Sequence, residues 1–217
     1  MQYFRYAPQK YLNYALAAVL FFTSLQFLTA QRRFSAEAVA GLTASQIDGD
    51  QSAGFHKVGL QGGLGVATRL KGKQSASIQM LFTQRGCRNQ PQVFPYFKTT
   101  LNYVEVPLQW HYADWLVEGE GRNDDWYRAR FSAGLSFARL ISYQNHYDDY
   151  GITAALPDLN SNSLCLVVGA SIFTNRHIGF TFRYNRWLTP LYRPGTGKNY
   201  AKNLFERFIA IQLNYRL

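Results

Sequence analysis

The ten residues from Phe208 to Leu217 limit the possible folds more than any other stretch. Their sequence, FIAIQLNYRL, places a large apolar side chain at every second position, with Ala, Gln, Asn and Arg between them. A period of two is that of a β-strand, whose alternate side chains point to opposite faces. Because the second face carries compact polar groups and no lysines, we predict a strand of a narrow closed barrel. Its polar face lines the lumen and its apolar face contacts lipid.

Seven further stretches repeat this alternation. The predicted strands are 34–43, 58–70, one from the turn at 71–73 to about 86, then 101–112, 127–137, 164–172, 178–185 and the closing strand 208–217. Long connections are expected after the first, third, fifth and seventh strands: 45–54, one ending at 98, 143–163 and 191–204. Short turns follow the second and sixth, and 114–125 is intermediate. This asymmetry is typical of outer-membrane barrels, so both chain termini are expected in the periplasm.

The same alternation would suit a soluble barrel of the lipocalin kind, so the orientation of the wall depends on the charged residues. The lysines fall in turns, loops, strand ends or the N-terminal segment, whereas a water-facing sheet carries them along its strands. The chain also has 15 tyrosines, which suit a membrane boundary where the ring and the hydroxyl are both satisfied. We therefore predict an all-β, eight-stranded antiparallel up-and-down transmembrane barrel in the cell outer membrane.

Two local features needed a separate interpretation. The glycines at 59, 63 and 65 match neither GxGxxG nor GxxxxGK, and they indicate close packing in a small barrel. Pro107 lies in the middle of a predicted strand, where proline removes a backbone donor. We therefore expect a β-bulge at Pro107.

The charged residues identified within the predicted strands fall on the face assigned to the lumen. An eight-stranded barrel is only wide enough for side chains to fill its interior. Because isolated charges there would cost several kcal/mol each, we expect a hydrogen-bonded plug rather than a conduction pathway. The predicted lumen network comprises Glu37, Arg69, Glu105, Arg128, Arg130, Arg183 and Arg216.

Residues 1–30 form a predicted signal peptide, whose cleavage would leave 31–217 as the barrel domain. Arg5 and Lys10 precede an uncharged run from Tyr11 to Gln31, and Ala30 lies at the expected cleavage site. A retained membrane-spanning helix is the alternative, since about 20 apolar residues suffice to span a membrane. Export implies an oxidising compartment in which Cys87 and Cys165 could pair. Their strands are expected on opposite sides of the barrel, so two reduced thiols are the preferred interpretation.

Several stretches, taken together, resemble the PorT-like outer-membrane β-barrel family of Bacteroidetes. They are GLTASQIDGD (Gly41–Asp50), MLFTQRG (Met80–Gly86), LNYVEVPL (Leu101–Leu108), FSAGLSFARLIS (Phe131–Ser142) and FRYNRWLTPL (Phe182–Leu191). The resemblance covers Phe34–Leu217 and implies an outer-membrane barrel. The namesake of the family belongs to the type IX protein secretion machinery. The resemblance therefore implies a non-enzymatic accessory subunit of a secretion or assembly complex, and it carries no catalytic motif.

Arg139 and Arg186 are exceptions to the facing rule, because they occupy apolar-face positions near strand ends at the outer rim. There they could bind lipopolysaccharide phosphates, or they could merely extend to the interface. Because binding to lipid phosphates can explain an excess of cationic residues, the formal net charge of +10 is not evidence for nucleic-acid binding. The expected partners are outer-membrane lipid, lipopolysaccharide and possible secretion or assembly subunits.

Two other functions remain as alternatives. One is a lipid A-modifying enzyme using the residues Ser142, His146, Asp148 and Asp149, which are close in sequence. The other is a surface adhesion barrel. Asp48-Gly49-Asp50 is interpreted as a turn rather than a calcium loop, and His56, His111 and His177 are too scattered for a zinc site. No metal or other cofactor is predicted.

Overall fold

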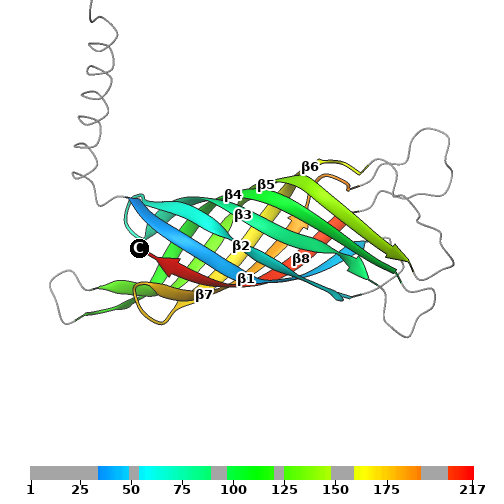
Figure 1. Ribbon diagram of the computed structural model, residues 1–217. Coiled ribbons are helices and arrows are strands. Elements are labelled where there is room, and N and C mark those ends of the chain that lie inside the picture. The colour runs from blue at the N-terminus through cyan, green and yellow to red at the C-terminus, as the bar shows by residue number, and fades with distance from the viewer. Residues whose placement is uncertain (1–33, 49–53, 89–96, 120–124, 148–158, 192–204) are drawn as a thin grey trace, which may run out of the picture. The chain divides into compact units, whose positions relative to one another are not determined.

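The computed structural model describes residues 34–48, 54–88, 97–119, 125–147, 159–191 and 205–217. They form eight antiparallel strands closed into a barrel (Figure 1). The strands are β1 (Phe34–Asp48), β2 (Lys57–Arg69), β3 (Gln74–Arg88), β4 (Phe97–Val117), β5 (Trp126–Tyr147), β6 (Asn162–Phe173), β7 (Ile178–Trp187) and β8 (Phe205–Arg216). No helix within the described ranges has the length and apolarity needed to cross a membrane. The predicted signal peptide, 1–30, lies outside the described residues.

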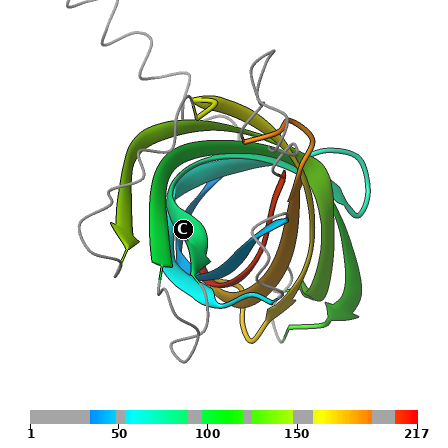
Figure 2. The same ribbon diagram turned by 90° about the vertical axis from the view of Figure 1, so that its right-hand side faces the viewer.

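Each strand pairs with its neighbours in the chain, and β1 pairs with β8 to complete the ring. Figure 2 views the ring from one end and shows the strands enclosing a common centre. In the closing ladder Leu42 lies opposite Ile211, and Glu37 lies opposite Arg216. The predicted eight-stranded antiparallel up-and-down barrel is therefore confirmed.

The two faces of the wall differ sharply in chemistry. Large apolar side chains cover the outside, where Leu64 is 69% exposed, Met80 65% and Ile211 61%. The inside is polar, and Glu105 and Arg183 are 0% and 3% exposed. An apolar surface of this extent is unsuited to water and suits contact with acyl chains. The prediction that apolar side chains point outward and polar side chains point into the lumen is therefore correct.

The two ends of the barrel differ in their connections. The short-turn end carries the tight turns 70–73 and 174–177 and the eight-residue connection 118–125. The long-loop end carries two connections that also have eight residues, 49–56 and 89–96, and the two longest, 148–161 and 188–204. The start of β1 and the C-terminus lie at the short-turn end (Figure 1). In outer-membrane barrels this is the periplasmic end.

Several strands are longer than predicted. β1 continues past 43 to Asp48, because Ser45 faces inward and its Oγ donates a hydrogen bond to the carbonyl oxygen of Gly86 at 2.8 Å. β4 and β5 have 21 and 22 residues, against predicted strands ending at 112 and 137. A polar residue can thus continue a barrel strand when it points into the lumen.

The β4–β5 extension, residues 114–117 and 126–128, projects beyond the residues paired with the neighbouring strands at the short-turn end (Figure 1). Leu116 lies opposite Tyr127 in this ladder. Lys73 Nζ donates a hydrogen bond to Asp114 Oδ1 at 2.9 Å, and this bond raises the pKa of Lys73. The sequence prediction placed residues 114–125 in a polar connection. It was wrong for 114–117, where Trp115, Leu116 and Val117 favour a strand.

The predicted bulge at Pro107 is also wrong. The β4–β5 ladder runs without a shift through Pro107 and Ser136, and its register shift lies between Asn102 and Tyr103. On the other side, the β3–β4 pairs are interrupted between Ile78↔Leu108 and Leu81↔Glu105 without a change of register. Pro107 is therefore accommodated by omitted pairs toward β3 rather than by an extra residue.

The glycines of β2 serve close packing, as predicted. A Cβ atom on Gly63 would collide with the carbonyl oxygen of Met80 on β3, and one on Gly59 would collide with that of Gln84. At Gly62 the nearest atom would be 3.4 Å away, an ordinary contact. Glycine is therefore required at the inward positions 59 and 63 and not at the neighbouring position 62.

Candidate functional site

The lumen near the long-loop end is built around one wholly buried arginine, Arg85 of β3. Its Nη2 donates to Glu105 Oε2 at 3.4 Å, and both side chains are 0% exposed. The guanidinium also lies over three aromatic rings, 4.4 Å from the centroid of Tyr103, 4.3 Å from Phe208 and 5.1 Å from Trp187. Desolvated contacts of this type stabilise a cation that has lost its water.

Glu105 of β4 is the most connected carboxylate of this region. Its Oε1 accepts from Ser136 Oγ at 2.8 Å, and its Oε2 accepts from Thr83 Oγ1 at 3.0 Å as well as from Arg85. Thr83 in turn accepts from Gln61 Nε2 at 2.9 Å, and Gln61 accepts from Gln212. Hydrogen bonds therefore cross the lumen from β8 through β2 and β3 to β4.

A second group lies nearer the short-turn end and is organised by Arg183 of β7. Arg183 Nη2 donates to Gln79 Oε1 at 3.0 Å and to Gln109 Oε1 at 2.9 Å. Gln79 Nε2 donates to Glu37 Oε1 of β1. Glu37, Glu105 and Arg183, three members of the predicted network, are therefore buried and hydrogen bonded.

The remaining predicted members lie toward the short-turn end. Arg130 and Arg216 both lie over the ring of Phe173, at 5.0 and 3.9 Å from its centroid. Arg128 instead packs over Trp115 and Trp126 in the β4–β5 extension, at 5.1 and 5.9 Å.

Arg130 and Arg216 are half-buried in the lumen, whereas two predicted members fall outside it. Arg128 lies in the extension, and Arg69 is exposed at the last position of β2. Alternation assigned both to the inward face, but at these positions the strand end lies beyond the part of the barrel that encloses a lumen.

Sequence reasoning missed three buried, inward-facing charged residues: Lys57, Arg85 and Glu206. Arg85 had been placed on the inward face but was left out of the predicted network. Glu206 precedes the predicted start of the closing strand, and β8 begins at Phe205. Extending the alternation of Phe208 and Ala210 by one step would have placed Glu206 inside, where it is 0% exposed.

Cys87 and Cys165 are both buried at the long-loop end of the lumen, and no disulfide joins them. They belong to one cluster with Leu101, Tyr103 and Trp187. The two residues therefore lie in the same cluster, although their strands were expected to keep them apart on opposite sides of the barrel.

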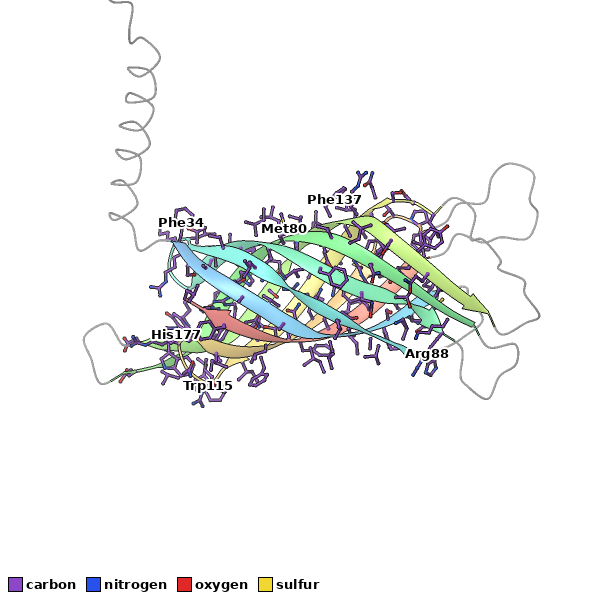
Figure 3. The ribbon with its side chains drawn as sticks, in the orientation of Figure 1. Phe34, Met80, Arg88, Trp115, Phe137 and His177 are labelled. Atoms are coloured by element: carbon purple, nitrogen blue, oxygen red, sulfur yellow. The ribbon has the colours of Figure 1, made fainter. Side chains whose placement is uncertain are left out.

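The two outward arginines lie where predicted, exposed near the long-loop end. In the ladders Arg139 is opposite Val104 and Asn162, and Arg186 is opposite Leu166 and Arg207. The structure adds a second outward pair of cations, since Arg88 lies directly opposite Lys98. Arg88 extends away from the wall in Figure 3. We call Arg139, Arg186, Arg207, Arg88 and Lys98 the rim cations.

Of the four residues considered for a lipid A-modifying enzyme, Ser142 and His146 lie on β5. Ser142 Oγ accepts from Asn102 Nδ2 at 2.9 Å, and Ser142 is exposed. His146 follows four positions later on β5, a backbone separation of about 13 Å at the usual rise of a strand. Asp148 and Asp149 lie outside the described residues. The described side chains contain no group of three or more His, Cys, Asp or Glu suited to holding a metal ion.

Residues 25–193 match the family described as outer membrane protein beta-barrel domain. No curated protein matches the chain significantly.

Solved barrels of similar architecture include OprG from Pseudomonas aeruginosa, with 9% identity, a TM-score of 0.44, and coverage of 85% of this chain and 96% of that one. Ail, the attachment invasion locus protein of Yersinia pestis, has 11% identity and a TM-score of 0.41, covering 86% and 100%. Neisserial surface protein A has 12% identity and a TM-score of 0.40, covering 85% and 97%.

The family match spans well over half of the chain, and the closed barrel has the apolar outer wall and polar interior that such a domain requires. The chain therefore belongs to the outer membrane protein beta-barrel domain family, and its barrel lies in the cell outer membrane.

Proposed function

We propose that this barrel is a non-enzymatic accessory subunit of an outer-membrane complex, of the kind that carries out type IX protein secretion or outer-membrane assembly. The observation that carries the proposal is the filled lumen, in which Arg85, Glu105 and Gln212 are 0% exposed. A barrel with a filled lumen has no open channel for solutes. Its outer wall and its two ends are the surfaces that partners can contact. The PorT-like sequence stretches support the choice of complex.

The β4–β5 extension supports contact with a partner at the periplasmic end. Trp115 and Leu116 are 60% and 47% exposed beyond the neighbouring strands. Trp115 also has a φ of 60°, a conformation that costs energy for a residue other than glycine and is retained where the surroundings require it.

Affinity purification from native membranes in mild detergent tests this proposal. The wild-type barrel should co-purify with components of a secretion or assembly complex. The double variant Trp115→Ala/Leu116→Ala should lose them while retaining the compact heat-modifiable band of a folded barrel. Phe34→Ala is the matched control, because Phe34 is also exposed and apolar on β1. A wild-type barrel that purifies alone would contradict the accessory role and favour adhesion or catalysis.

The absence of catalysis is tested separately, on the group that the sequence suggested for lipid A modification. His146→Ala should leave the mass spectrum of lipid A unchanged in cells that carry the variant as their only copy. A change in acylation matching that of a deletion strain would instead support the enzyme.

The rim cations are proposed to bind lipopolysaccharide phosphates. Arg186 and Arg207 are directly opposite each other on β7 and β8, and Arg88 and Lys98 are opposite on β3 and β4. Like charges in directly opposite positions repel each other and destabilise a sheet. A bridging phosphate removes this repulsion, and arginine is suited to bidentate binding of phosphate.

Lipopolysaccharide retained through purification measures this binding. Arg139→Gln/Arg186→Gln should retain clearly less lipopolysaccharide per barrel than wild type. Arg69→Gln should retain as much as wild type, because Arg69 is an exposed arginine at the short-turn end. Equal retention by all three proteins would remove lipopolysaccharide from the proposal.

A further inference from the structure

A small cavity lies in the lumen beside Arg183. It measures about 10 Å³, close to the space that a single water molecule or an ion of similar size requires. Its walls come from β1 and from β3 through β8, so it lies at the centre of the polar network. The lining residues used below are Glu37, Gln79, Gln109, His111, Arg130 and Arg183.

Two residues that line this cavity, Arg183 and Gln109, carry buried hydrogen-bond donors that have no partner among the described residues. Arg183 uses Nη2 for Gln79 and Gln109, whereas its Nε and Nη1 are buried and make no hydrogen bond to any described residue. Gln109 accepts from Arg183 through Oε1, and its buried amide nitrogen Nε2 has no acceptor in the described part of the chain. Arg183 and Gln109 are 3% and 1% exposed. A buried donor left in this state costs free energy.

His111, which also lines the cavity, has a buried ring nitrogen without a hydrogen-bond partner among the described residues. His111 is 5% exposed, and its Nε2 is 2.7 Å from Ser77 Oγ. Its Nδ1 is buried and has no hydrogen-bond partner among the described residues. When Ser77 donates to Nε2, the neutral ring carries its proton on Nδ1, which adds another donor.

The charges of the lining are unequal. Arg130 and Arg183 are cations, and Glu37 is the carboxylate among the lining residues. Glu37 already accepts from Gln79. The next carboxylate, Glu105, interacts electrostatically with Arg183, but both of its oxygens are occupied by Thr83, Ser136 and Arg85. The lining therefore has one more cation than anion.

We propose that this cavity binds a monovalent anion of halide size, such as chloride. A water molecule would bring two hydrogens that need acceptors, and the unpartnered groups of Arg183 and Gln109 are donors. A halide accepts several N–H bonds at once and balances the excess cation. Charge-assisted hydrogen bonds of this type are strong in a buried site.

Thermal unfolding of the detergent-purified barrel at constant ionic strength provides the first test. Replacing sodium gluconate by sodium chloride or bromide should raise the melting temperature in a saturable manner, by about 2–4 °C once the site is mostly occupied. Gluconate is too large for the cavity. A melting temperature that does not depend on the halide would contradict the proposal.

Two variants identify the site. Gln109→Glu places a carboxylate where it can accept from Arg183 and supply the missing negative charge, so it should fold and lose the halide dependence. Arg130→Gln should also lose it, because the excess cation is removed. Arg128→Gln should keep it, since Arg128 packs on Trp115 and Trp126 away from the cavity. Halide dependence that persists in both lining variants would overturn the proposal.

A crystal of the wild-type barrel grown in sodium bromide locates the ion without any variant. An anomalous peak beside Arg183 and Gln109 is expected. Ordered density without anomalous signal at this position would show water in the cavity and overturn the proposal, even if the melting temperature responds to halide elsewhere.

Discussion

Arg85 shows how a single charged side chain is kept inside this barrel. It is fully buried, with Glu105 as its hydrogen-bonded counter-ion and three aromatic rings around the guanidinium. Glu206 is also fully buried and interacts electrostatically with Arg85. The cation therefore compensates two buried carboxylates.

Arg85→Met should destabilise the barrel by about 3–5 kcal/mol, because it leaves buried carboxylates without their cation. Urea unfolding of barrels reconstituted in lipid vesicles measures this change. The double variant Arg85→Met/Glu206→Gln should recover part of the loss, since one carboxylate becomes neutral. Arg139→Met, at an outward exposed position, should change the unfolding free energy little. A loss in Arg139→Met as large as in Arg85→Met would refute this account.

At the scale of the strand, β2 shows why its inward glycines are required. The strand passes so close to β3 that Gly63 has no room for a Cβ atom, whereas Gly62 beside it has. Gly63→Ala should lower the unfolding free energy by about 1–3 kcal/mol through this overpacking. Gly62→Ala should have a much smaller effect. Urea unfolding of the two variants in the same vesicles makes the comparison, and equal effects would rule out the packing explanation.

The strands also show what the sequence can and cannot predict. Alternation depends only on the order of residue types, so it correctly placed Ile211 outside and Arg183 inside. It could not predict that Arg183 bonds Gln79, 104 positions earlier, because that contact depends on strand tilt and register. At Pro107 local propensity predicted a bulge, but the missing donor was absorbed by omitted pairs with β3. Trp115–Val117 was assigned to a connection because polar neighbours outweighed its strand-forming residues.

At the scale of the whole molecule, the orientation of the wall can be measured by fluorescence. Trp110 lies on the outside and is 45% exposed, whereas Trp187 lies in the lumen and is 1% exposed. Variants that keep one of the 4 tryptophans, with Phe at the other positions, should respond differently to brominated acyl chains. The lipid should quench Trp110 strongly and Trp187 weakly. Stronger quenching of Trp187 would reverse the assigned faces.

The filled interior also predicts electrical behaviour. Barrels inserted into planar bilayers should show no steady ohmic conductance, because buried side chains of opposite walls are hydrogen bonded across the lumen. Single-channel recording measures this, with a porin as the positive control for insertion. Reproducible conductance steps would contradict a plugged lumen.

The pairing of β1 with β8 determines when this sheet can be completed. The strand β1 pairs with β2 on one side and with β8 on the other. An incomplete sheet therefore keeps an unpaired edge on β1 until β8 is available. Closure must therefore follow synthesis and export. A factor that binds this unpaired edge therefore recognises the incomplete sheet, because the edge is covered by β8 in the closed barrel.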